Sequence, residues 1–249
     1  MDWVKDFFDT AGAWWGQQQV RPSDHERVAR MRRMGAPTTG RVLELGAGSG
    51  TTALVTAQAG YDVTAVELSA TRAQHMRDRL AESNVSNVTV LEGDFYELDL
   101  DGPFDCVTYW NGFGVGTDAE QRLLLRRIAS TWLAPGAPFV VDVMSPFRWA
   151  AVAGKTFSEE DVAGFINACD YDPVLNRYSD AWWPVGRESE RQSQSGRCYT
   201  PADFRMLVEK TGLTITSWEA CGEPFDAQKP ADSTHPIWTC WEYTASLTN

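Results

Sequence analysis

The residues best suited to chemistry lie in the segment 42–50, where an apolar run leads into a glycine-rich turn. A predicted helix follows this turn. Its glycines Gly46, Gly48 and Gly50 follow the spacing G-x-G-x-G. Because glycine has no Cβ, the backbone of such a turn can approach a ligand closely. An open parallel sheet uses a turn of this kind to hold an adenosine-containing cofactor.

A carboxylate follows this turn at a suitable distance. Glu67 ends a second apolar run, residues 63–66, and its oxygens can accept hydrogen bonds from both hydroxyls of a ribose. A dinucleotide fingerprint, G-x-G-x-x-G, would need a glycine where the chain has Thr51. The spacing therefore disfavours a nicotinamide-dependent oxidoreductase.

The segment E-L-G-A-G-S-G, followed by Glu67, resembles the first two motifs of class I S-adenosylmethionine-dependent methyltransferases. The similarity covers about residues 41–143 and implies S-adenosyl-L-methionine as the cofactor. The flanks, residues 2–9, 111–114 and 197–201, are similar to bacterial small-molecule methyltransferases, including amino-sugar N-methyltransferases. They support a subfamily and name no substrate.

The resemblance implies roles for residues that follow the ends of predicted strands. The three glycines would wrap the amino-acid part and the ribose of the cofactor. Glu67 would hold the ribose diol, and Asp94 would bind the adenine amino group. With one aromatic residue of an N-terminal lid added, the predicted cofactor set is Trp15, Glu44, Gly46, Ala47, Gly48, Gly50, Glu67, Leu68, Asp94, Phe95, Trp110 and Asn111.

The catalytic candidates are His25, Tyr109 and His235. Histidine titrates near neutrality, so either histidine could be the base if the acceptor loses a proton, with a structural role as the alternative. Tyr109 would lie on the methionine side, under the methyl group. Methyl transfer from a sulfonium depends mainly on alignment and on the exclusion of water, so a strong base is optional. The sequence therefore identifies the donor better than the accepting nitrogen or oxygen.

The elements that must position these residues alternate between strands and helices. The pattern predicts an α/β fold: a Rossmann-like, doubly wound, seven-stranded sheet, mostly parallel with an antiparallel final strand, plus a small antiparallel β insertion. The predicted strands are 41–45, 62–66, 88–91, 105–109, 138–143, 213–218 and 237–243, and the helices of the core are 49–59, 71–82 and one through Leu123, Leu124, Ile128 and Trp132.

The whole chain, 1–249, is predicted to be a single methyltransferase domain. Its aromatic N-terminal segment, which includes Trp14 and Trp15, would be either a lid over the ligands or a helix pinned to the core. The predicted parts are an N-terminal helical lid region at 1–35, a cofactor-binding core at 36–145, a β-hairpin insertion or cap at 165–200, and a C-terminal helix with the final strands at 201–249.

The charge and the cysteine content of the chain limit which partners, metals and cross-links are expected. The net charge of −12 argues against nucleic acid and favours a small-molecule methyl acceptor. Arg27, Arg30, Arg32 and Arg33 are predicted to form the solvated face of a helix whose Val28 and Met31 point inward. The five scattered cysteines are predicted to be reduced thiols, and no metal site is predicted.

The chain lacks an apolar run long enough to cross a membrane and a signal peptide, so a cytoplasmic location is expected. The oligomeric state stays open, a homodimer included. The predicted function is methyl transfer from S-adenosylmethionine to a small-molecule acceptor of specialised metabolism. The alternatives are a noncatalytic S-adenosylmethionine-binding or regulatory protein and, less favoured, the nicotinamide-dependent oxidoreductase.

Overall fold

The computed structural model describes residues 2–162 and 164–249 and contains two sheets. The strands of the large sheet are β1 (Gly40–Leu45), β2 (Tyr61–Glu67), β3 (Val88–Glu92), β4 (Cys106–Phe113), β5 (Phe139–Met144), β10 (Thr214–Ala220), β11 (Glu223–Pro224) and β12 (Glu242–Thr248). The small sheet consists of β6 (Thr156–Phe157), β7 (Phe165–Asp172), β8 (Arg177–Pro184) and β9 (Gln192–Arg197).

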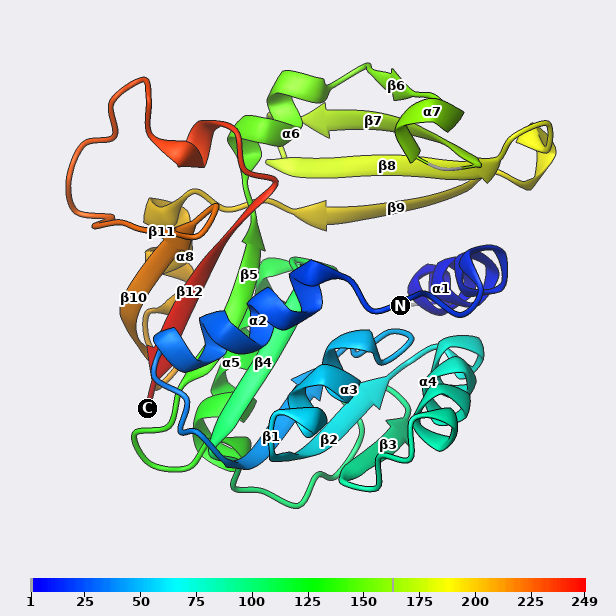
Figure 1. Cartoon of the computed structure of the whole chain (residues 1–249). Coiled ribbons are helices and arrows are strands. Elements are labelled where there is room, and N and C mark those ends of the chain that lie inside the picture. Colours follow the sequence, from blue (N-terminus) through cyan, green and yellow to red (C-terminus); the bar gives the residue numbers. More distant parts are fainter. Residues whose placement is uncertain (1, 163) are drawn as a thin grey trace.

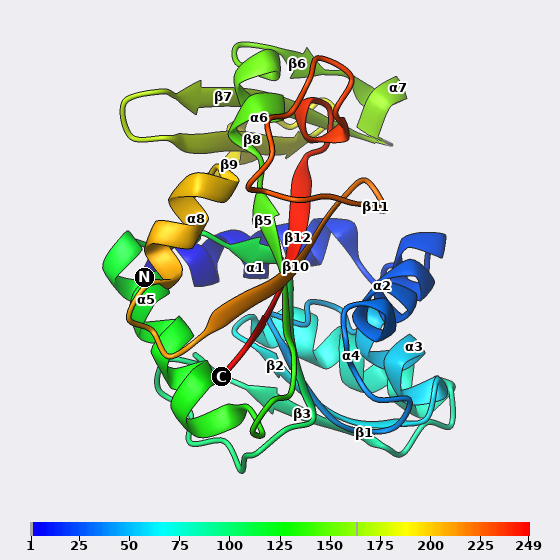
Figure 2. The same cartoon turned by 90° about the vertical axis from the view of Figure 1, so that its left-hand side faces the viewer.

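Helices connect and cover these strands. They are α1 (Asp2–Trp15), α2 (Pro22–Arg33), α3 (Thr51–Gln58), α4 (Ala70–Glu82), α5 (Asp118–Arg127), α6 (Pro146–Val152), α7 (Glu159–Val162) and α8 (Pro201–Val208). A π-helical turn, Ile128–Trp132, continues α5, and short 3-10 turns occupy Glu188–Glu190 and Pro236–Trp238. As Figure 2 shows, α5 and α8 cover one face of the large sheet, while α2, α3 and α4 cover the other.

The large sheet has the order β11-β10-β12-β5-β4-β1-β2-β3. Strands β1 to β5 pair in parallel, whereas β12 is antiparallel to both β5 and β10. This confirms the predicted Rossmann-like sheet with an antiparallel end. The sheet has eight strands where seven were predicted, because the two-residue strand β11 forms an additional edge next to β10.

The small sheet, in the order β6-β7-β8-β9, is antiparallel and lies at one end of the large one (Figure 1). It corresponds to the insertion expected at 165–200, extended by β6. We refer to it as the cap sheet. Figure 1 places it above the carboxyl ends of β4 and β5, where open α/β sheets bind ligands.

Local signals explain the positions of several helices. Ser69, at the N-cap of α4, accepts a hydrogen bond from the backbone of Arg72. Thr200 and Asp203 form a capping box at the start of α8, with a proline at the first turn.

The last strand begins five residues later than predicted. Pro236 opens a 3-10 turn, and Trp238 of that turn packs on Phe147 of α6 with ring centroids 4.6 Å apart. The apolar residues that suggested a strand from 237 are therefore used in side-chain packing before β12 starts at Glu242.

Two cysteines differ from the prediction of reduced thiols. Cys221 and Cys240 form a disulfide with a Cα–Cα distance of 5.9 Å, because the antiparallel strands β10 and β12 bring them together. Cys106, Cys169 and Cys198 are free and buried.

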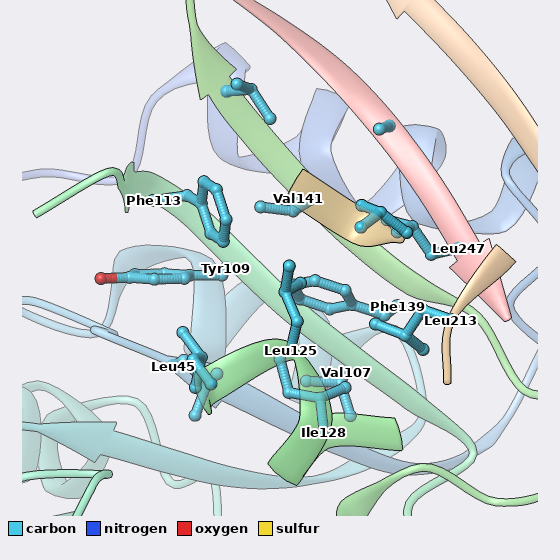
Figure 3. Packing of buried hydrophobic residues seen from close by; sticks show 14 of the residues in the cluster. Leu45, Val107, Tyr109, Phe113, Leu125, Ile128, Phe139, Val141, Leu213 and Leu247 are labelled. Atoms are coloured by element: carbon cyan, nitrogen blue, oxygen red, sulfur yellow. The ribbon is translucent and has the colours of Figure 1, made fainter. Parts of the chain in front are cut away.

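The core lies on both faces of the large sheet. In Figure 3, Leu45, Val107 and Val141 from neighbouring strands pack with Leu125 and Ile128, from α5 and the turn that follows it. Among the described residues, no helix is long and apolar enough to span a membrane.

The prediction for α2 was only half correct. Val28 and Met31 are buried against the sheet as expected. The arginines were expected in solvent, but Arg30 is mostly buried and its Nε donates to Glu219 at 2.7 Å. Arg33 Nη2 also reaches Glu219, at 3.1 Å. The i, i+3 spacing of Arg27 and Arg30, next to that of Val28 and Met31, is the signal that places them toward the sheet.

Candidate functional site

A cavity of about 310 Å³ opens at the carboxyl ends of β1, β2 and β4. Residues from all three strands line it, together with side chains from α1, α2 and the cap strand β9. All predicted cofactor residues except Trp15 and Gly50 line this cavity: Glu44, Gly46, Ala47, Gly48, Glu67, Leu68, Asp94, Phe95, Trp110 and Asn111.

The glycine turn forms the floor of the cavity. Gly46 and Gly48 have φ angles of +62° and +60°, which residues with a Cβ rarely adopt. Gly50 has a structural role instead, because a Cβ there would lie 2.2 Å from Cγ of Met76. The backbone of the turn is thus exposed to a ligand at Gly46 and Gly48 and packed against α4 at Gly50.

Glu67 holds the turn in place. It is 4% exposed, and its two oxygens accept hydrogen bonds from the backbone N–H groups of Gly48 at 2.6 Å and Ser69 at 2.9 Å. A carboxylate has about four acceptor positions, so both oxygens can accept further bonds from ribose hydroxyls.

Asp94 and Phe95 line the neighbouring part of the cavity, after β3. Asp94 Oδ1 accepts a hydrogen bond from the backbone of Tyr96 at 2.8 Å, which fixes the turn. The Phe95 ring lies edge-on to Tyr109, with centroids 5.6 Å apart. These residues present one acidic and one aromatic group to a planar ligand.

Glu44 is a buried polar residue of the cavity that lacks a hydrogen-bond partner, in the part of the chain that the structure describes, at one of its oxygens. Its side chain is 3% exposed, and its Oε2 has no hydrogen-bond partner within the described residues. Burial raises the pKa of Glu44 from 4.5 to about 8, although Arg27 nearby opposes this shift. A ligand that donates a charged hydrogen bond would satisfy this oxygen.

Arg27 lines the same cavity and was missed by the sequence analysis as a ligand-binding residue. Its guanidinium lies 5.7 Å from the centroid of the Trp110 ring and donates to Oγ1 of Thr52 at 3.1 Å. The cavity therefore presents a cation and an unpartnered carboxyl group side by side, which suits the zwitterionic end of an amino acid.

The N-terminal helix α1 closes one side. Val4 and Phe8 line the cavity, and Asp9 accepts a hydrogen bond from Ser69 Oγ at 2.6 Å. Arg72 lies between two rings of this helix, 5.1 Å from the Phe8 centroid and 5.6 Å from that of Trp15. Trp15 itself lies outside the cavity lining and packs on Arg72 and Trp182.

The three catalytic candidates do not come together. Tyr109 lines the cavity, but burial raises the pKa of its phenol well above the usual value, so it can position a ligand and not accept a proton. His25 is exposed on α2. His235 is half-buried, and its Nδ1 accepts from the backbone of Ile237 at 3.2 Å. Neither histidine lines the cavity, so their predicted role as bases stays a prediction.

A family model and a curated relative both identify this chain as similar to methyltransferases. Residues 42–136 match a family model described as a methyltransferase domain. A cypemycin N-terminal methyltransferase from a Streptomyces species is 32% identical over 201 residues, which cover 77% of this chain and 81% of that protein.

Two solved structures share the fold. The CcbJ methyltransferase from Streptomyces caelestis has a TM-score of 0.76 at 24% identity, covering 99% of this chain and 96% of its own. An S-adenosylmethionine-bound amino pentose methyltransferase from Micromonospora echinaspora, involved in calicheamicin biosynthesis, has a TM-score of 0.59 at 20% identity, covering 93% and 92%.

Proposed function

Because this chain belongs to the S-adenosylmethionine-dependent methyltransferases, we propose that it methylates an amine nitrogen of a small natural product or short peptide. The cypemycin enzyme, by its name, acts at an N-terminus, and the Micromonospora enzyme acts on an amino pentose. Both acceptors carry an amine and belong to natural products. An amine with a free lone pair also needs little catalytic help, which suits a cavity that the histidines do not reach.

The observation that carries the donor assignment is the unpartnered Oε2 of Glu44 beside Arg27. In our proposal Glu44 accepts from the ammonium of the methionine part, and Arg27 binds its carboxylate. Glu67 holds the ribose hydroxyls through its remaining acceptor positions. Asp94, Leu68 and Phe95 surround the adenine. The residues present therefore fit each chemical part of S-adenosylmethionine.

When bound, S-adenosylmethionine supplies the methyl group, whose bond to sulfur breaks with the electron pair staying on sulfur as the acceptor nitrogen forms the new bond. The chain contributes alignment and a dry site. Phe8 and Val4 of α1 cover the cavity from one side, and Gln194 of the cap sheet reaches it from another. Asn111, with φ of +55°, turns the backbone at the rim of the cavity.

We place the reaction in the cytoplasm, since a donor with a sulfonium and a zwitterionic end does not cross membranes freely. The noncatalytic alternative predicts donor binding without transfer, and the experiment below separates the two.

The test is an incubation with a donor that carries a trideuterated methyl group. The acceptors are tetrapeptides and amino sugars, each supplied with a free and with an acetylated amine. We expect mass spectrometry to find the deuterated methyl on free amines only. Transfer to the acetylated partners, or donor binding without any transfer, would contradict the proposal.

A further inference from the structure

A second hollow, of about 200 Å³, lies where β12 begins. Glu242 there pairs with Met144, the last residue of β5, so the hollow adjoins the carboxyl edge of the parallel strands. The proposed donor site does not use it. Its lining residues are Arg30, Cys221, Thr239, Cys240, Trp241, Glu242 and Thr244.

Asp142 is buried behind this hollow. Its side chain is 1% exposed, and its Oδ1 accepts from Thr244 Oγ1 at 2.7 Å and lies 3.6 Å from Arg30 Nη1. Thr244 and Arg30 both line the hollow. The backbone of Asn111, which lines the donor cavity, lies near the Asp142 carboxyl and opposes the rise of its pKa that burial causes. The other oxygen, Oδ2, is buried without a partner among the described residues.

Two of the three arginines nearby are already paired with a buried carboxylate. Arg30 and Arg33 both bond to Glu219, whereas Arg27 lies 3.8 Å from Asp24 and is the arginine that the proposed donor site uses. By contrast, within the described part of the chain the Glu242 carboxyl forms no hydrogen bond or ion pair. Asp142 and Glu242 therefore interact with each other and with the guanidinium groups of Arg27 and Arg30, and Arg30 is shared between Asp142 and Glu219.

The pKa of the Glu242 carboxyl follows from its burial and from these neighbouring charges. Burial and the neighbouring Asp142 raise the pKa of Glu242 from 4.5 to about 7, while Arg27 and Arg30 on α2 oppose the shift. Bringing a cation into the hollow would favour the ionised carboxylate and relieve its repulsion with Asp142.

One wall of the hollow is aromatic. Trp241 is 36% exposed and lies 5.0 Å from Trp149, with the Arg148 guanidinium 4.7 Å from its ring centroid. An aromatic face next to a carboxylate suits an ammonium group that carries an apolar substituent.

We propose that the methyl acceptor binds in this hollow as an ammonium, held by Glu242 beside Trp241, with the buried Asp142 adding its negative charge from behind. This inference rests on the proposed function and adds the acceptor-binding residues to it. The ammonium transfers one proton to the Glu242 carboxylate, which leaves a neutral amine with a free lone pair. After the nitrogen has gained the methyl group, the methylated amine is again a cation, and Glu242 releases its proton to solvent.

The test measures binding of phenethylamine to the full chain saturated with S-adenosylhomocysteine, by ligand-observed NMR. The uncharged analogue 2-phenylethanol is the comparison ligand. Glu242→Gln should weaken phenethylamine binding by about tenfold or more and leave 2-phenylethanol unaffected. Asp142→Asn should act in the same direction, and Glu223→Gln, an exposed glutamate on β11, is the matched control without effect.

A second readout is the pH dependence of wild-type binding. Phenethylamine affinity should rise between about pH 6 and about pH 8, as Glu242 ionises, and Glu242→Gln should flatten that rise. Equal affinity for the amine and the alcohol, or unchanged amine binding in Glu242→Gln with S-adenosylhomocysteine still bound, would overturn the inference and leave the proposed function intact. Failure of the wild type to bind S-adenosylhomocysteine would overturn both.

Discussion

At the scale of single residues, two buried glutamates of the cavity behave differently because their partners differ. Glu67 accepts two backbone hydrogen bonds, so each of its oxygens has a partner in the fold without a ligand. Glu44 has an oxygen without a partner and holds its proton more tightly. Removing each side chain should therefore have a different effect on stability and on donor binding.

Glu67→Ala should weaken S-adenosylmethionine binding by about 1.5–3 kcal/mol, the range for hydrogen bonds to a charged group. Part of this loss comes from the Gly48 backbone, which loses its acceptor. Titration calorimetry measures it, and Glu92→Ala, in register with Glu67 on the next strand but exposed, is the control. An unchanged dissociation constant for Glu67→Ala would contradict the ribose assignment.

Glu44→Gln should weaken donor binding and stabilise the ligand-free fold at alkaline pH. The folded protein binds the Glu44 proton up to about pH 8, whereas the unfolded chain releases it near 4.5, so ionisation of Glu44 lowers stability as the pH rises through this window. Glutamine does not ionise, so the variant keeps the stability that the wild type loses when Glu44 ionises. The ligand-free variant should melt a few degrees higher than wild type at the alkaline end, since about 1 kcal/mol corresponds to roughly 2–4 °C.

The measurement is a series of melting curves across this pH range, with calorimetry of donor binding on the same samples. Parallel melting curves for the two proteins, or undiminished S-adenosylmethionine binding in Glu44→Gln, would contradict the role assigned to Glu44.

Backbone geometry alone determines the position of residues that follow strand ends. Gly46, Gly48, Glu67 and Asp94 are of this kind, and the structure brings them to the cavity, while their roles in binding stay predictions. Arg27 depends on how α2 docks on the sheet, which local sequence does not specify. His235 lies outside the cavity because its loop is held by Phe225 and Ile237.

At the scale of elements, α2 contributes Arg27 to the donor cavity and Arg30 to the second hollow, and ion pairs attach this helix to the sheet. Glu219 of β10 is 5% exposed and forms ion pairs with both Arg30 and Arg33. Removing one partner of such a buried pair leaves an uncompensated charge.

Glu219→Ala should therefore lower the free energy of unfolding by about 3–5 kcal/mol. Glu26→Ala is the matched control, because Glu26 also pairs with Arg33 but is 46% exposed, and its loss should cost about 1 kcal/mol or less. Urea unfolding of both variants measures the difference. Equal losses would show that the α2 pairs do not differ in burial as the structure indicates.

The helix α1 is the element whose role as a lid can be separated from a structural one. Its contacts with α4, through Asp9 and Ser69 and through Arg72, lie beside the cavity and not under the main core. Removing residues 1–16 should leave a cooperatively folding protein with modestly weaker donor binding and a much larger loss of turnover, since the site can no longer exclude water.

Melting curves and methyl-transfer assays on this truncation measure the two effects. Loss of a cooperative melt would mean that α1 is a structural part of the core, and full activity would mean that it is neither lid nor core.

Elements were predictable in proportion to how local their signals are. The parallel strands and the capped helix α8 were found because apolar runs and N-caps specify them. The start of β12 was misplaced because Trp238 packs on α6, and the disulfide was missed because it depends on the pairing of β10 with β12. Both depend on contacts between segments distant in sequence.

At the scale of the whole molecule, ligands meet where three parts converge: the parallel core, the N-terminal helices and the cap sheet. The donor cavity takes residues from all three, such as Glu67, Phe8 and Gln194. The second hollow lies at the start of β12, which pairs with β5, and Arg30 of α2 also lines it. In our proposal this arrangement gives the donor and the acceptor separate binding regions.

The central claim is that the glycine turn, Glu44 and Glu67 form a site for S-adenosylmethionine and not for a dinucleotide. Titration calorimetry of the full chain with S-adenosylmethionine, and separately with NAD⁺, tests it most directly. We predict one molecule of S-adenosylmethionine bound per chain and no competition from NAD⁺. Displacement of S-adenosylmethionine by NAD⁺, or an absence of S-adenosylmethionine binding, would contradict the claim.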